Sequence, residues 1–312
     1  MKKLILTPKD DLQHILNSIS EPATIFLKSG IYRAKAELKA ENVTLIGESR
    51  ETTVIEYDDY ARKIHADGKE YNTFRTYTLC VTGNGTRLEN LTVLNSNTNP
   101  REKGQCVALS VNAKSFYAKN VKLKSTQDTL FLSPFPDDLV VRYRGFIPHR
   151  QLYSEGVSLH LFENCRIEGT VDFIFGGSEA YFKNCEIVSL YDDRHTGFIA
   201  APCHHLVQSV GFNFIGCNLT GGGAGRGEVY LARPWRDFGK CAFLNCRAEN
   251  HINPALFDKW NDTERDKTAR FGFYGLDCDF TPEPVSWAKK YNEIEAKNII
   301  ESCECKFKEY NR

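Results

Sequence analysis

A short strand-like pattern recurs through the middle of the chain and limits the fold more than any other feature. In each copy an aromatic residue or leucine is followed by a polar residue, usually asparagine, and then by cysteine or an aliphatic residue. The copies lie at residues 88–93, 117–123, 162–167, 181–187, 214–219 and 243–246. Their spacing is 20 residues from Asn164 to Asn184 and 30 from Asn90 to Asn120. Repeats of this length are typical of solenoids.

Little helical periodicity lies between these copies, so each repeat contributes strands that must stack on their neighbours to bury an apolar face. The pattern therefore predicts an all-β fold, a parallel β-helix, with asparagines forming a ladder at one corner and the adjacent cysteines filling the interior. A Greek-key β-sandwich is the alternative, but its hairpin turns need more Asn-Gly or Asp-Gly pairs than this sequence has.

Helical periodicity is confined to the two ends of the chain. Near the N-terminus we expect a helix capped by Thr7, with Pro8 in its first turn and an apolar face at Leu12, Ile15, Leu16 and Ile19. A second short helix is predicted near the other end, with Trp287, Tyr291, Ile294 and residues 297–299. No linker interrupts the pattern, so we expect a single domain over residues 1–312.

The net charge indicates which partners the protein could bind, and the cysteine content indicates the redox state of its cellular compartment. Forty Lys and Arg balance forty Asp and Glu, so nothing indicates a nucleic-acid or anionic-membrane partner. No apolar run is long enough for a membrane span or a signal peptide. The eleven cysteines are odd in number and lie mostly in strand-like segments, which favours free thiols in a reducing compartment. We therefore expect a cytoplasmic monomer, or a secreted protein if a signal peptide has been removed.

Three segments depart from the repeat and carry the residues suited to chemistry. Asp172 stands in an apolar run, where an unpaired carboxylate would be costly to bury. Asp128 and Arg233 supply a second carboxylate and a guanidinium, while Gln105 and Gln127 supply amide donors. The alternative interpretation is structural: Asp172 would cap a turn, Asp128 would be a turn residue and Arg233 a surface cation.

Four motifs in these segments resemble the pectin methylesterases, or pectinesterases, in their bacterial form. They read Gln-Cys-Val-Ala-Leu at 105–109, Gln-Asp-Thr-Leu-Phe at 127–131, Asp-Phe-Ile-Phe-Gly at 172–176 and Leu-Ala-Arg-Pro-Trp at 231–235. The segment at 197–202 resembles the bacterial version. Phe131 and Ala232 depart from the usual tyrosine and glycine. The resemblance implies a right-handed parallel β-helix, in agreement with the repeat.

The resemblance also implies a mechanism. Asp172 is the expected nucleophile, which attacks the methyl ester of a galacturonate in pectin or oligogalacturonides, and Arg233 holds it charged. Asp128 is the expected general acid that protonates departing methanol, and then the base that activates water. Gln105 and Gln127 are expected to stabilise the oxyanion. The substrate contacts expected are Trp235, Phe175, Phe131 and Thr78, and no metal or organic cofactor is required.

Two other classes of protein are alternative interpretations of this sequence. A β-helix polysaccharide lyase or glycoside hydrolase would act on the same polymer, and a non-catalytic carbohydrate-binding repeat protein would need no buried aspartate. A basic stretch at residues 142–150 is interpreted either as a solvated loop or as a rim that contacts free carboxylates on partly demethylated substrate.

Overall fold

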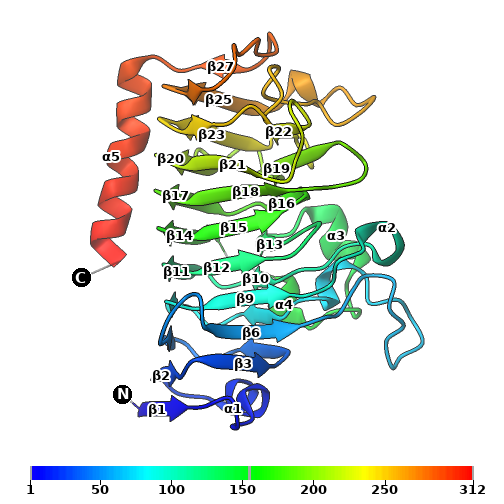
Figure 1. Ribbon diagram of the computed structural model, residues 1–312, viewed down its shortest axis with the longest axis vertical. Coiled ribbons are helices and arrows are strands. Elements are labelled where there is room, and N and C mark those ends of the chain that lie inside the picture. The colour runs from blue at the N-terminus through cyan, green and yellow to red at the C-terminus, as the bar shows by residue number, and fades with distance from the viewer. Residues whose placement is uncertain (1, 154–155, 311–312) are drawn as a thin grey trace.

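Three parallel sheets run the length of the molecule in the computed structural model, which describes residues 2–153 and 156–310. Figure 1 shows the coils stacked along the long axis, with the N-terminal strand at one end and β27 (Lys289–Lys290) at the other. The strands of the three sheets pair in parallel, each with strands of the neighbouring coils. The predicted all-β, right-handed parallel β-helix is confirmed.

The first sheet has eleven strands, ending at β27. The others are β1 (Lys2–Leu6), β2 (Ala23–Leu27), β5 (Thr44–Gly47), β8 (Thr86–Glu89), β11 (Ser115–Lys119), β14 (Leu159–Glu163), β17 (Glu179–Lys183), β20 (Phe212–Ile215), β23 (Lys240–Leu244) and β25 (Arg270–Tyr274). The second sheet has nine, namely β3 (Gly30–Arg33), β6 (Thr53–Tyr57), β9 (Thr92–Asn95), β12 (Lys122–Lys124), β15 (Arg166–Gly169), β18 (Glu186–Leu190), β21 (Asn218–Gly222), β24 (Arg247–Ala248) and β26 (Asp277–Cys278). The third has seven, namely β4 (Ala36–Leu38), β7 (Leu79–Val81), β10 (Leu109–Val111), β13 (Leu130–Leu132), β16 (Val171–Gly176), β19 (Gly197–Pro202) and β22 (Val229–Ala232).

The repeated asparagine forms the corner between the first and second sheets. Asn90, Asn120, Asn164 and Asn184 all adopt a positive φ between 52° and 54°, a conformation that asparagine tolerates better than most residues. The Asn120 side-chain amide donates to the Asn90 side-chain oxygen at 2.8 Å, which is a rung of the predicted ladder. A left-handed residue at this corner turns the chain sharply, so the next strand starts on a new face.

The residues beside this corner fill the interior. Cys165, Cys185, Cys217 and Cys246 are buried, and each thiol donates to backbone carbonyls, including one in the preceding coil. The eleven cysteines are all free, as expected. Aromatic rings stack in the same interior at centroid separations of 4.4–4.9 Å, in the order Phe162, Phe182, Phe214 and Phe243. These ladders explain why the repeat keeps aromatic and small apolar side chains.

Both terminal helices differ from the predicted ones. α1 (Leu12–Ser18) follows a strand, β1, that the sequence did not predict, and its N-cap is Asp11 instead of Thr7. Thr7 and Asp10 hydrogen-bond to each other in a turn, so Pro8 lies outside the helix.

At the other end α5 (Glu293–Tyr310) has 18 residues, more than the short helix expected, and Trp287 and Tyr291 precede it. It lies along one side of the stack in Figure 1, and Ala296, Cys303 and Phe307 pack on the first sheet. None of the described helices is long and apolar enough to cross a membrane.

Short helices also occur in excursions from the coils: η1 (Thr73–Arg75), α2 (Pro100–Lys103), α3 (Asp137–Arg142), α4 (His149–Leu152) and η2 (Arg265–Lys267). α3 and α4 belong to the long excursion between β13 and β14. Leu139 of α3 and Leu152 of α4 are buried beside Phe74, Phe135 and other aromatic rings. This packing fixes the excursion beside the third sheet, where the candidate residues lie.

Candidate active site

All five residues predicted to be catalytic line one cavity of about 330 Å³. Three successive coils place four of them, because the backbone N–H of Cys106 donates to the Gln127 carbonyl and that of Asp128 donates to the Val171 carbonyl. Asp172 follows Val171 directly in β16. Arg233 enters from the end of β22, two strands further along the third sheet.

The backbone at both carboxylates is unusual. Asp128 has a φ of 65° and Asp172 a φ of 50°, and neither residue is an asparagine or glycine. The pairing of β16 with β19 shifts register between Val171 and Ile174, so Asp172 and Phe173 lie in a bulge. Bulges redirect side chains, and strained backbone is concentrated at functional sites. The bulge directs Asp172 towards the cavity while the next side chain, Phe173, stays fully buried in the core.

Gly169 in β15 packs against the bulge of β16. A Cβ atom at this position would lie 2.3 Å from the Phe173 Cβ, closer than side chains tolerate. Only glycine therefore lets β15 approach the bulge that presents Asp172.

Arg233 donates two parallel hydrogen bonds to the carboxylate of Asp172. Its Nε donates to Oδ1 at 2.8 Å and one Nη donates to Oδ2 at 2.6 Å. The guanidinium is itself held between the rings of Phe198 and Trp260, each with its centroid 3.9 Å from Cζ. Such bidentate, stacked geometry is specific to arginine. The pair is thus fixed in orientation before any substrate arrives.

The two carboxyl groups differ in their electrostatic surroundings. Asp128 is 9% exposed, and burial together with the charge of Asp172 raises its pKa well above the usual value for aspartate. Burial also raises the pKa of Asp172, and the charge and hydrogen bonds of Arg233 oppose this. As the pH rises, Asp172 therefore ionises first, and Asp128 keeps its proton to higher pH. Arg233 opposes the effect of burial on Asp172, but the pKa of Asp172 still lies above the usual value for aspartate.

Gln127 is oriented by a contact that the sequence did not reveal. One Nη of Arg194 donates to Gln127 Oε1 at 2.9 Å, and Arg194 is fixed in turn by Asp192, with Nε–Oδ1 and Nη–Oδ2 distances of 2.7 and 2.6 Å. Because this contact fixes the Gln127 oxygen, it also sets the orientation of the amide N–H groups, and the Gln127 side chain is hydrogen-bonded to Asp128. Arg194 is a positioning residue, and its own loop carries no motif that would have identified it.

Of the three aromatic residues predicted to contact substrate, two line the cavity. Trp235 and Phe175 line the cavity, with ring centroids 5.6 Å apart and planes at 73°. Phe131 does not line it: the side chain is fully buried in β13, with Phe74 at 5.0 Å and Phe175 at 5.1 Å. Trp260 also lines the cavity, and nothing in the sequence of its loop indicated this position.

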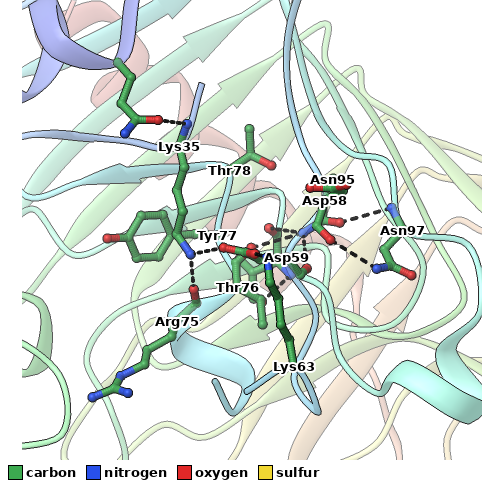
Figure 2. A network of polar contacts seen from close by, with 12 residues as sticks. Lys35, Asp58, Asp59, Lys63, Arg75, Thr76, Tyr77, Thr78, Asn95 and Asn97 are labelled. Carbon is green, nitrogen blue, oxygen red and sulfur yellow. Dashed lines mark hydrogen bonds and ion pairs between the residues drawn. The ribbon is translucent and has the colours of Figure 1, made fainter. Parts of the chain in front are cut away.

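Thr78, also predicted as a substrate contact, does not line the cavity. It is fully buried, and its hydroxyl donates to the Leu94 carbonyl at 2.9 Å. Figure 2 shows Thr78 beside the polar network in which Lys35 and Lys63 both contact the buried Asp59. The Thr78 side chain is therefore buried and hydrogen-bonded to the backbone, away from the cavity.

Comparison with known proteins decides the family. A family model described as Pectinesterase matches residues 5–135 and 138–299. The chain belongs to the pectinesterase family. It is 31% identical over 288 residues to Pectinesterase 31 of Arabidopsis thaliana, covering 88% of this chain and 80% of that protein. With Pectinesterase QRT1 of the same plant it shares 28% identity over 309 residues, covering 95% of this chain and 72% of the relative.

Solved pectin methylesterases have the same fold. One in complex with a hexasaccharide superimposes with a TM-score of 0.78 at 22% identity, over 95% of this chain and 94% of that chain. The enzyme from Yersinia enterocolitica gives a TM-score of 0.70 at 26% identity, over 93% and 92%. As a member of the pectinesterase family, the chain is an enzyme, a carboxylic ester hydrolase. The narrower bacterial-type assignment stays a prediction.

Proposed function

We propose that this enzyme removes methyl groups from methyl-esterified galacturonan and releases methanol, with Asp172 as nucleophile and Asp128 as general acid and base. The observation that carries the proposal is the pair of buried carboxyl groups in one cavity. Among the described residues, an arginine hydrogen-bonds to Asp172 and none to Asp128. A nucleophilic carboxylate must be ionised, and a general acid must be protonated. Arg233 favours the ionised form of Asp172, whereas burial and the charge of Asp172 favour the protonated form of Asp128.

The proposed reaction has two steps. Asp172 attacks the ester carbonyl carbon, and the electron pair moves to the carbonyl oxygen, where the amides of Gln105 and Gln127 would stabilise the charge. When the tetrahedral intermediate collapses, the C–O bond to the methoxy group breaks and Asp128 donates its proton to form methanol. The acyl-enzyme anhydride is then hydrolysed by water that gives its proton to Asp128, which restores both acids. Loss of one oxyanion donor typically costs about 2.7–4 kcal/mol of transition-state stabilisation.

Methanol release measured together with chain length tests the proposal. On a methylated hexagalacturonate the enzyme should release methanol and create one carboxylate per methanol, while the oligomer length stays unchanged. Shortened products, or unsaturated ends without methanol, would favour a glycoside hydrolase or a lyase. Binding without any reaction would favour a carbohydrate-binding protein.

Trp235 is proposed to supply contact area for a sugar ring. We expect Trp235→Ala to raise KM about 10-fold while changing kcat much less, because stacking contributes equally to ground and transition states. Steady-state kinetics on methylated oligomers measure this. A fall in kcat at unchanged KM would instead assign Trp235 to transition-state positioning.

We also propose that the enzyme works as a monomer in the cytoplasm, where only imported fragments of the polymer would reach it. The free, mostly buried thiols support a reducing compartment. On this proposal kcat/KM per ester should be higher on methylated trimers to hexamers than on pectin. A clear preference for the polymer would contradict the intracellular location but not the esterase chemistry.

A further inference from the structure

Gln105 and Gln127 are both proposed to stabilise the oxyanion, but the structure holds their side chains in different ways. Arg194 donates a hydrogen bond to the side-chain oxygen of Gln127. Gln105 is partly buried at the cavity, and none of residues 2–153 and 156–310 forms a hydrogen bond with its side chain. The direction of the Gln105 amide therefore depends on how its backbone is held.

Two neighbouring segments hold the backbone around Gln105. The Gln105 carbonyl accepts a hydrogen bond from the Ala61 N–H at 3.0 Å. Two residues later, the Val107 N–H donates to the Thr76 hydroxyl at 2.9 Å. The segments that contain Ala61 and Thr76 therefore set the position of Gln105 in the cavity.

A single buried side chain joins these two segments to the one that contains Gln105. Asn95, the last residue of β9, is 1% exposed. Its amide nitrogen lies within hydrogen-bond distance of three carbonyl oxygens, those of Asp59 at 2.9 Å, Thr76 at 3.0 Å and Val107 at 3.2 Å. Figure 2 shows Asn95 with Asp59 and Thr76 in one polar network. Asn95 is thus a common donor for the backbone around Gln105.

Asp59 anchors the segment that reaches Gln105. Its carboxylate is buried and contacts the ammonium groups of Lys35 and Lys63, so the side chain ties this residue to the fold as firmly as the carbonyl does. Two residues further along, the same segment donates to the Gln105 carbonyl. Loss of the Asn95 amide would free this anchored segment to shift relative to Gln105.

We propose that Asn95 is a positioning residue for the reaction, which keeps the Gln105 amide directed at the oxyanion by joining the backbone segments on both sides of it. The inference rests on the proposed function. Asn95 does not itself line the cavity, so it acts only through other residues. A donor stabilises the oxyanion when it is held at hydrogen-bond distance in advance, so a small shift of Gln105 should lower kcat more than it weakens substrate binding.

A double-mutant cycle with Gln105 tests the proposal. Asn95→Ala should lower kcat for methanol release from a methylated hexagalacturonate by about 10- to 100-fold, with KM changed by less than about 2-fold. In a Gln105→Ala background the same substitution should lower kcat by less than about 2-fold, because the donor that Asn95 positions is already absent.

A second variant provides the same test if Asn95→Ala does not fold. Thr76→Val keeps the shape of the side chain but removes the hydroxyl that accepts from the Val107 N–H. It should also lower kcat in the unmodified background and have little further effect in the Gln105→Ala background.

Asn213→Ala is the matched control. Asn213 in β20 is 5% exposed, its amide donates to the Gly211 carbonyl at 3.1 Å, and it does not line the cavity. Both Asn95→Ala and Asn213→Ala should lower Tm, because each removes a buried hydrogen-bond donor. Only Asn95→Ala should lower kcat.

An unchanged kcat in folded Asn95→Ala would overturn the proposal, and so would a loss that adds fully to that of Gln105→Ala. An equal loss of kcat in Asn213→Ala would also overturn it, because reduced stability would then explain the effect. Absence of methanol with the unmodified enzyme, or wild-type kcat in Gln105→Ala, would refute the proposed function instead.

Discussion

Asp172→Asn is expected to lower methanol release by about 10⁴-fold or more, because an amide cannot act as the carboxylate nucleophile and no other group can replace it. Asparagine keeps the shape and one hydrogen-bond acceptor for Arg233, so the cavity should keep its form. The rate is measured on a methylated hexagalacturonate, with circular dichroism and Tm recorded on the same preparation.

Some loss of stability is expected in this variant. Arg233 is largely buried, with 14% of its side chain exposed, and it would lose its charge partner. A lower Tm with a native far-UV spectrum would agree with the account. Near wild-type turnover in a folded Asp172→Asn protein would contradict the nucleophile assignment.

Arg233→Gln is expected to shift the acidic limb of the kcat/KM profile to higher pH by about 1–3 units. Burial already raises the pKa of Asp172, and Arg233 is the main group that opposes this rise. Without its positive charge the carboxylate ionises at higher pH, so the active form is lost at pH values where the unmodified enzyme still works. The rate above the new limb should also fall, because the bidentate orientation is gone.

Two variants serve as controls for this shift. Arg233→Lys keeps the positive charge but not the bidentate hydrogen bonds of the guanidinium. Its acidic limb should therefore move less than in Arg233→Gln, while the rate above the limb should still fall. Arg236→Gln removes another cation that lines the cavity, but this arginine is paired with Asp138. The pH of its acidic limb should therefore stay unchanged. An unchanged acidic limb in Arg233→Gln would remove this residue from its electrostatic role.

The repeat predicted the architecture because each of its positions has a physical task. The asparagine takes the left-handed corner, and the residue beside it, such as Cys165 or Cys185, fills the interior. The terminal helices were less predictable. Thr7 and Pro8 carry capping signals, yet the chain uses them in a turn because β1 pairs with β2 just before it.

The candidate site was predictable where chemistry conflicts with the local pattern. Asp172 in an apolar strand is such a conflict, and the bulge and the Arg233 pair resolve it. Trp260 and Arg194 could not be predicted, because their loops meet the cavity only through the stacking of distant coils. Phe131 lies in β13 and Thr78 directly before β7, and only the packing shows that both side chains are buried away from the cavity.

The assignment of different roles to the two carboxyl groups is the central claim, and the leaving group tests it most directly. A galacturonate trifluoroethyl ester releases an alcohol that needs less help from a general acid than methanol does. With this ester the account predicts that Asp128→Asn releases a rapid burst of about one equivalent of trifluoroethanol per enzyme and then slows as the acyl-enzyme accumulates. Asp172→Asn should release none above the uncatalysed rate. A burst in Asp172→Asn, or no alcohol from folded Asp128→Asn, would contradict the assignment of nucleophile and acid.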